Sequence, residues 1–285
     1  MLTLILDGVA YGMLLFVLAC GLAVTLGLMN FVNLAHGAFA MAGGYLVVAL
    51  TMRYELPFLW SLPIAFVGVG LLGMLAFVLV YRHIIRKSHL DQVLFSIGVV
   101  FMSIATMDYF MGTQQQFARL PEYLQGRVEF AGLGLGAYRL FIIVVCAALA
   151  IALQWVLSST RFGSRLRAAV DDPPVASGLG INVNWVFLIT FGVGSGLAGL
   201  GGALGIEILG LEPTFPLKFM IYFLVVVAVG GTSSISGPLL ASLLLGVADV
   251  TGKYYVPQLG AFIIYSLMIV ILMLRPQGLF ARGAK

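Results

Sequence analysis

The stretch LILDGVAYGMLLFVLACGLAVTLGLM, residues 4–29, contains one charged side chain, Asp7, in a run of apolar and small residues. A membrane-spanning helix needs about 20 consecutive, predominantly apolar residues. A helix also satisfies its backbone hydrogen bonds within one segment, which hydrocarbon requires. The stretch therefore predicts a transmembrane helix, and the rest of the chain shows whether it stands alone.

The composition of the whole chain agrees with this first segment. Of 285 residues, 61% are hydrophobic and only 9% are charged, and the mean hydropathy is +1.10. Soluble domains carry about 25% charged residues, so a soluble protein is excluded. The apolar runs are long and continuous, without the alternation typical of outer-membrane barrel strands, and we expect helices.

Nine apolar segments emerge from the length criterion for a membrane span. They are Leu4–Met29, Phe31–Met52, Phe58–Tyr81, Leu90–Gly112, Tyr138–Leu157, Trp185–Ile206, Phe219–Gly230, Ile235–Val250 and Leu259–Leu274. The seventh and eighth are short and meet at GGTSSISGP (Gly230–Pro238), as two short spans or one broken hairpin. We expect an all-α polytopic transmembrane bundle of about eight to nine membrane segments, forming a single domain over residues 1–285.

The basic residues predict the orientation of this bundle. Three clusters stand between apolar segments: Arg82/Arg86/Lys87, Arg161/Arg165/Arg167 and Arg275/Arg282/Lys285. Nine crossings place all three on one side, and loops rich in Lys and Arg mark the cytoplasmic side. The C-terminus is therefore expected in the cytoplasm and the N-terminus outside. The formal charge of +4 lies in these clusters, so no nucleic-acid partner is expected.

Two glycine-rich interruptions suggest an internal repeat. Gly27–Gly37 and Gly230–Gly237 each interrupt an apolar run with glycines and small polar residues. Paired interruptions in the two halves of a chain are typical of transporters built from inverted repeats. An inverted repeat is therefore expected, with both stretches near the transport path.

The sequence contains no motif that supports catalysis or cofactor binding. The sequence GSGLAG (Gly194–Gly199) matches the dinucleotide pattern, but it lies inside a charge-free apolar span, where small residues let helices approach closely. The chain contains no Walker A motif and no metal-ligand cluster, so we expect no catalytic residue, cofactor or metal. Cys20 and Cys146 lie within apolar runs and are interpreted as small buried residues.

The polar stretch of residues 158–184 predicts two short helices. Thr160 or Ser159 can cap the first, and Asp172 can cap the second with Pro173 at its first position. Gly178 or Gly180 ends the second helix. The pair fits either an amphipathic linker on the lipid surface or a docking surface for a cytoplasmic partner.

The stretch NFVNLAHGAF (Asn30–Phe39) is the most polar part of the first two segments. Asn33 can cap the second helix and Asn30 can satisfy the preceding turn, which places His36 and Gly37 on the first turn. A histidine hydrogen-bonded within the bundle is one reading, and a polar hinge lining the transport path is the other.

The whole chain resembles the permease subunits of branched-chain amino-acid-type ABC importers. Four stretches carry the resemblance: Gly27–Phe39 with Gly43, Gly44 and Tyr45; Thr160–Gly163 with Arg167, Ala168, Asp171, Ala176 and Gly180–Asn182; Gly230, Gly231, Ser234, Ile235, Gly237 and Pro238; and Leu274–Phe280. The chain departs from the family pattern at Pro173-Pro174, which replaces more polar residues, and at Ser233 and Ala241, where glycine is more usual.

The resemblance implies a machine of several subunits in a bacterial-type inner membrane. This chain would assemble with a second homologous permease, two cytoplasmic ATPases that hydrolyse ATP, and an extracytoplasmic solute-binding protein. Membrane lipid would surround the complex. Residues 158–184 would be the loop that couples to an ATPase, through Arg161, Phe162, Gly163, Arg165, Arg167, Ala168, Asp171, Asp172, Ala176, Leu179, Gly180 and Ile181. The path or hinge would comprise Asn30, Asn33, His36, Gly37, Gly230, Gly231, Ser233, Ser234 and Gly237.

The expected function is to form the path for branched-chain or other hydrophobic amino acids. The same machinery also suits urea, short amides or aromatic acids. A stand-alone channel or secondary transporter is the alternative from another class, and it needs ionisable residues within the membrane for coupling. Its candidates, Asp108, Glu207 and Asp249, stand near predicted outer helix ends.

Overall fold

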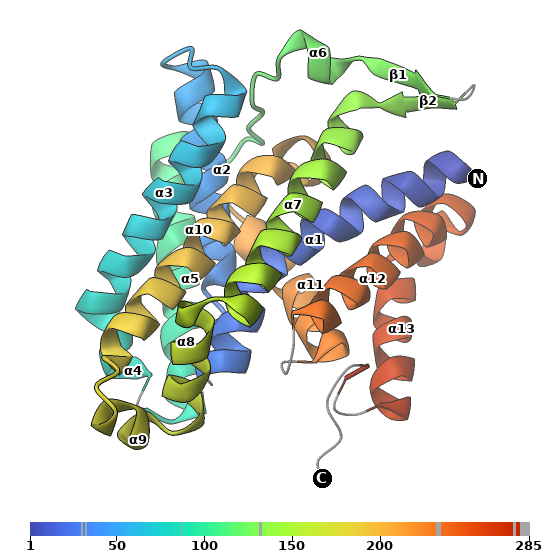
Figure 1. Cartoon of the computed structure of the whole chain (residues 1–285). Coiled ribbons are helices and arrows are strands. Elements are labelled where there is room, and N and C mark those ends of the chain that lie inside the picture. Colours follow the sequence, from blue (N-terminus) through green and yellow to red (C-terminus); the bar gives the residue numbers. More distant parts are fainter. Residues whose placement is uncertain are drawn as a thin grey trace.

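The computed structural model describes residues 1–29, 31, 33–85, 87–130, 133–231, 235–275 and 278–279. Within these ranges the chain forms a bundle of helices with a small β-hairpin at one end (Figure 1). The main helices are α1 (Leu2–Met29), α2 (His36–Met52), α3 (Phe58–Ala76), α5 (His89–Met111), α7 (Ala137–Ser159), α10 (Val183–Leu209), α11 (Phe215–Gly230), α12 (Ser236–Tyr255) and α13 (Gly260–Leu274). All nine predicted apolar segments are thus helical, which confirms the all-α polytopic bundle.

Short elements connect the main helices. A π-helical turn, η1 (Phe77–Tyr81), and α4 (Arg82–Ile84) extend α3, while α8 (Arg161–Asp171) and α9 (Pro173–Gly178) follow α7. The loop after α5 holds α6 (Glu122–Gln125), β1 (Arg127–Phe130) and β2 (Leu133–Gly136), and η2 (Pro257–Leu259) precedes α13. Of the described helices, five are long and apolar enough to cross a membrane: Leu2–Gly27, Phe58–Ile84, His89–Met111, Ala137–Ser159 and Val183–Leu209.

Several predicted boundaries were wrong. α2 begins at His36 rather than Phe31, because a turn occupies Leu34 and Ala35. α11 begins at Phe215 rather than Phe219, since Pro216 suits the first turn of a helix. α12 runs on to Tyr255 rather than ending at Val250, and α11 and α12 are compatible with both two short spans and one broken hairpin.

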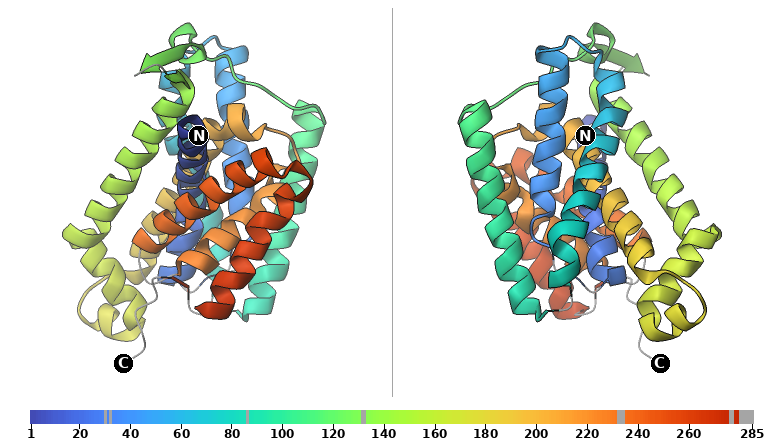
Figure 2. Two further views of the ribbon diagram at one scale, coloured as in Figure 1. Left: turned by 90° about the vertical axis from the view of Figure 1, so that its right-hand side faces the viewer. Right: turned by 90° about the vertical axis from the view of Figure 1, so that its left-hand side faces the viewer.

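The two ends of the bundle differ in structure. One end carries α6 and the antiparallel hairpin, in which Arg127 faces Gly136 and Phe130 faces Leu133 (Figure 1). The sequence reading did not predict this hairpin. The other end carries α4, α8 and α9, and α13 finishes there as well (Figures 1 and 2). The elements that bear the described basic clusters therefore lie at one end.

The centre of the bundle is the crossing of α10 with α1, α2 and α3. A Cβ added to Gly202 would collide with the backbone of Ala40, and one added to Gly43 would collide with Gly199. Gly21 approaches Gly194 in the same way. These glycines let helix backbones touch, as small residues do in membrane bundles. The GSGLAG stretch is thus a packing motif inside α10. Cys20 and Cys146 are both buried, as expected.

Candidate functional site

The start of α2 lies inside the bundle and is held by His36. Its side chain is 2% exposed, and its Nε2 lies 2.8 Å from the carbonyl oxygen of Leu18, in the middle of α1. The ring also packs edge-on against Phe223 of α11, with 6.2 Å between ring centroids. His36 is therefore hydrogen-bonded within the bundle and joins three helices.

The start of α11 lies beside the start of α2. A Cβ built on Gly37 would lie 2.9 Å from the Cα of Pro216, the second residue of α11. α2 runs from His36 to Met52, a rise of about 25 Å for its 17 residues. Two helices thus begin next to each other, most of a hydrocarbon core away from the loop that follows α2.

A charged pair stands beside these two helix starts. Lys218 Nζ, in the first turn of α11, lies 3.0 Å from Glu212 Oε1 in the preceding segment. The side chains are 53% and 33% exposed, so both reach the molecular surface. Ionisable residues at membrane depth are costly and mark substrate or ion routes. The helix starts and this pair make up a polar region within an apolar bundle.

The segment before α11 enters the bundle from the end that carries the β-hairpin. The backbone N–H of Gln116, in the loop after α5, donates to the carbonyl oxygen of Leu211 at 2.8 Å. Leu211 is fully buried, and its side chain would meet a Cβ placed on Gly44 of α2. From Leu211 the chain therefore descends along α2 to Pro216. This course of the chain places Glu212 between the loop after α5 and the helix starts.

Asn33 does not cap α2, contrary to the sequence prediction. The N-cap position is Ala35, with no side-chain cap hydrogen bond, and the N–H of His36 donates to the backbone oxygen of Asn33 at 3.3 Å. Asn33 is 1% exposed, and its Oδ1 has no hydrogen-bond partner among the described residues. Asn30, whose predicted role was in the preceding turn, lies outside the described residues.

The second predicted hinge lies at the opposite end of α11. Gly230 packs on Gly237 and Pro238 at the start of α12, and Gly231 adopts a φ of 81°, a conformation that favours glycine. The C-terminal segment joins this point, since Leu279 N–H donates to Val229 oxygen at 2.8 Å. Ser233 and Ser234 lie outside the described residues. Gly37 therefore meets the start of α11 and His36 meets its middle, so neither reaches its glycine end.

The hairpin of α8 and α9, named the coupling hairpin here after its predicted role, is built from three side-chain caps. Thr160 Oγ1 accepts from Gly163 N–H at 3.3 Å, and Asp172 Oδ1 accepts from Val175 N–H at 3.0 Å with Pro173 at the first position of α9. Asn182 Oδ1 then accepts from Trp185 N–H at 3.0 Å to begin α10. The first two caps confirm the predicted pair of helices.

The inner face of the coupling hairpin packs against the ends of α7 and α10. Leu166, Ala169 and Val186 are buried together, with Phe162 and Ile181 packed around them. A Cβ on Gly163 would collide with the backbone of Leu157, so α8 turns tightly against α7. Ala168 is half-buried and Ala176 is buried. These residues fix the hairpin on the bundle.

The outer face of the coupling hairpin is exposed and mixes charged with apolar side chains. It comprises Arg161, Arg165, Asp171, Asp172, Val175 and Leu179, with Gly180 turning the chain at a φ of 82°. Leu179, between Gly178 and Gly180, is 76% exposed. Arg167 instead donates through Nη1 to the backbone oxygen of Leu157 and so braces the hairpin.

The polar region at the start of α11 escaped the sequence reading. The segment LEPTFPLK, residues 211–218, has two prolines and two opposite charges between apolar runs, and that combination is visible in the sequence. Lys218 interrupts the apolar run, so the hydrophobic pattern alone predicts a segment that begins only at Phe219. Of the other acids singled out, Asp249 on α12 is 1% exposed and pairs with Lys253, with 2.5 Å between Oδ2 and Nζ.

A central glycine crossing, apolar helices long enough to cross a membrane and a polar hairpin at one end are the features of a polytopic membrane protein. Residues 4–272 match the family model described as branched-chain amino acid transport system / permease component. The chain belongs to that family.

Three relatives are each 26% identical to the chain and match 97% of it. They are a probable branched-chain amino acid transport permease protein LivH of Methanocaldococcus jannaschii, the high-affinity branched-chain amino acid transport system permease protein BraD of Pseudomonas aeruginosa, and the corresponding LivH of Escherichia coli K12. The matches cover 91%, 94% and 94% of these relatives, respectively. No solved structure matched the chain significantly.

Proposed function

We propose that this permease forms the path for branched-chain and similar hydrophobic amino acids in an ATP-driven importer of a bacterial-type inner membrane. Family membership and the names of the three relatives support the substrate class. The structural support is the pair of helices that begin beside each other inside the bundle, next to Glu212 and Lys218. Helix starts at membrane depth are where transporters of other folds bind substrate.

The path runs from the outer loops past the Glu212–Lys218 pair to the starts of α2 and α11. A zwitterionic amino acid carries a carboxylate, which a lysine ammonium attracts, and an ammonium, which a carboxylate attracts. Asn33, His36, Gly37 and the glycine junction Gly230, Gly231 and Gly237 hold the helices around this route. Asn30, Ser233 and Ser234 belong to the same two stretches of sequence.

The energy comes from partner subunits. Two cytoplasmic ATPases close together on ATP, and the coupling hairpin passes their motion to α10, to which it is joined through residues 179–182. Arg161 and Arg165 face acidic groups on the ATPase, while Val175 and Leu179 fill an apolar groove there. A second permease and an extracytoplasmic binding protein complete the importer, with the hairpin end inside and the N-terminus outside.

Reconstitution tests this function. Proteoliposomes that hold the permease with its ATPases, partner permease and binding protein should accumulate leucine only when ATP is present. Leucine uptake without any ATPase would show a stand-alone channel or secondary transporter instead. Uptake of urea, a short amide or an aromatic acid in place of leucine would reassign the substrate while leaving the machine intact.

The docking assignment is tested by charge reversal. Arg161→Glu with Arg165→Glu should abolish co-purification of the ATPase and leucine uptake, because both arginines are exposed and have no hydrogen bond or ion pair with a described residue. Arg53→Gln, in the exposed loop after α2, is the control. Unchanged co-purification in the double variant would contradict the assignment.

A further inference from the structure

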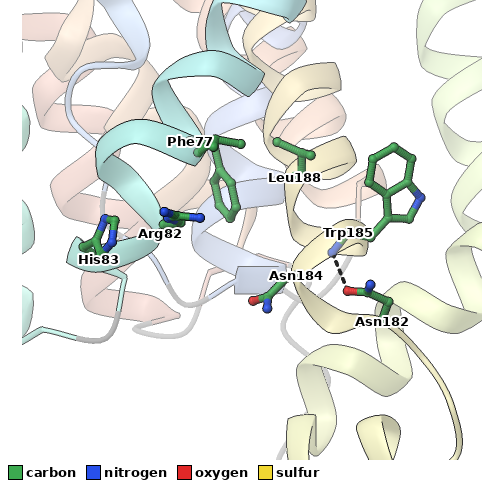
Figure 3. A pocket seen from close by; sticks show the side chains of 8 residues that line it. Phe77, Arg82, His83, Asn182, Asn184, Trp185 and Leu188 are labelled. Atoms are coloured by element: carbon green, nitrogen blue, oxygen red, sulfur yellow. Dashed lines mark hydrogen bonds between the residues drawn. The ribbon is translucent and has the colours of Figure 1, made fainter.

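A cavity of about 420 Å³ opens between the end of α3 and the start of α10, at the end of the bundle that carries the basic clusters. Its lining comes from η1 and α4 on one side and from the first turns of α10 on the other (Figure 3). Phe77, Val78, Trp185 and Leu188 form an apolar part. Arg82, His83, Asn182 and Asn184 form a polar part.

The polar part of this cavity has unused hydrogen-bonding groups. The side chains of Arg82, His83 and Asn184 form no hydrogen bond or ion pair with any described residue. Asn182 is already engaged, because its carboxamide oxygen caps α10 at Trp185 (Figure 3). Arg82 therefore presents an uncompensated guanidinium, with an amide donor across the cavity, where an anionic oxygen would bind.

The π-helical turn sets this geometry. Residues 77–81 form a turn wider than an α-helical one, and such turns occur often at functional sites. Phe77 and Tyr81 point into the bundle, with 4% and 2% exposure. The next two residues, Arg82 and His83, are exposed at the rim of the cavity.

The apolar part of the cavity lies on the surface of the bundle. Val78 and Leu79 next to it are 39% and 62% exposed, and Trp185 is 58% exposed, so an acyl chain could reach this side. Tryptophan favours the boundary between headgroups and acyl chains. The cavity thus offers an anion-binding rim at headgroup level and an apolar wall that extends along α3 and α10.

We propose that this cavity binds an anionic phospholipid, with the headgroup phosphate on Arg82 and Asn184 and an acyl chain along Val78, Trp185 and Leu188. Basic pockets between transmembrane helices on the cytoplasmic side are suited to such headgroups. A bound lipid bridges the end of α3 to the foot of α10, directly after the coupling hairpin. The site is separate from the proposed substrate path.

Native mass spectrometry of the full chain in neutral detergent tests this site. Wild-type protein should retain phosphatidylglycerol about tenfold better than phosphatidylcholine with the same acyl chains, since one charge-assisted contact changes binding by about that factor. Arg82→Gln should remove the preference. Arg275→Gln, which takes one exposed charge from the same end outside the cavity, should keep it. Equal retention of both lipids by the wild type, or equal effects of the two variants, would overturn the proposal.

Two further measurements separate a lipid from a free anion. Phosphatidylglycerol with brominated acyl chains should quench the fluorescence of Trp185, and the extra quenching should vanish in Trp185→Phe, although Trp60 and Trp155 remain. Quenching unchanged in Trp185→Phe would refute the acyl-chain placement. Inorganic phosphate at millimolar concentration should not displace the lipid. Full displacement would show that the cavity holds a free anion and not a phospholipid.

Discussion

α10 and α5 are both long apolar helices, yet they occupy opposite positions in the bundle. Most of α10 is buried, whereas nearly all of α5 faces outward. α10 carries glycines at the positions where α1, α2 and α3 cross it. α5 has one glycine, Gly98, and a Cβ built there meets nothing within 4 Å. Hydrophobicity thus identifies a membrane helix, while glycine content separates the central helix from the peripheral one.

The same contrast extends to α7, which contains no glycine and is largely exposed. In lipid, apolar side chains gain little by moving from hydrocarbon to a protein interior, so close packing must bring helices together. Glycines permit that packing. The centre of this permease should therefore be sensitive to added volume, and its periphery should tolerate it.

The largest expected effect comes from adding volume at the centre. Gly202→Val forces a side chain into the backbone of Ala40, and overpacking of this kind costs about 3 kcal/mol or more where backbone blocks relaxation. The variant should fail to give a monodisperse peak on size-exclusion chromatography in detergent. Gly98→Val on α5 is the matched control and should elute as the wild type does. Normal elution of both variants would contradict the claim that α10 tolerates added volume less well than α5.

A smaller loss of stability is expected from the buried histidine. His36→Ala removes the hydrogen bond to Leu18 and leaves a void between α1 and α11, together costing about 2 kcal/mol. The midpoint of thermal unfolding, followed by tryptophan fluorescence, should fall. His83→Ala at the exposed rim of α4 should leave it in place. Equal midpoints for wild type and His36→Ala would show that the contact of His36 with Leu18 contributes nothing to stability.

A local effect is expected at Gly163, a glycine of the peripheral coupling hairpin that packs closely against the backbone of α7. Gly163→Val pushes α8 away from Leu157 and should loosen the coupling hairpin by about 1 to 2 kcal/mol without unfolding the bundle. Trypsin should then cleave faster at the arginines of α8. Gly178→Val, where a Cβ meets nothing within 4 Å, provides the comparison in α9. If both variants resist trypsin as the wild type does, the hairpin does not depend on this contact.

The smallest effect on stability, but a clear one on transport, is expected at the exposed ion pair. Lys218→Met leaves Glu212 unpaired at a partly exposed site, and surface pairs contribute only about 0.2 to 1 kcal/mol to folding. Leucine uptake by the reconstituted importer should fall about tenfold, since a charged contact to substrate is lost. Glu55→Gln in the outer loop is the control. Full leucine uptake by Lys218→Met would show that the Glu212–Lys218 pair is not part of the substrate path.

The sequence predicted the membrane class, all nine apolar helices and the capped hairpin after α7. These features depend on local signals, namely apolar length, Thr160, Asp172 and Pro173. The starts of α2 and α11 were misplaced because apolar residues continue outside the helix at Phe31, while polar Lys218 lies inside the first turn of α11, so the limits of the apolar runs differ from the limits of the helices. The meeting of Gly37 with Pro216 is a contact between distant parts of the chain, and no local pattern encodes it. The roles of the predicted site residues stay predictions.

The glycine contacts also determine how the molecule can move. The close contacts of α10 with α1, α2 and α3 leave no gap between their backbones, so we expect these helices to tilt together as one block. α10 is about 40 Å long for its 27 residues, and its foot is joined to the coupling hairpin. On such a lever arm, a tilt of roughly 5° displaces the far end by about 3.5 Å, which is close to the width of a water molecule. A small tilt of this block would therefore produce a displacement of molecular size at the opposite end of the bundle.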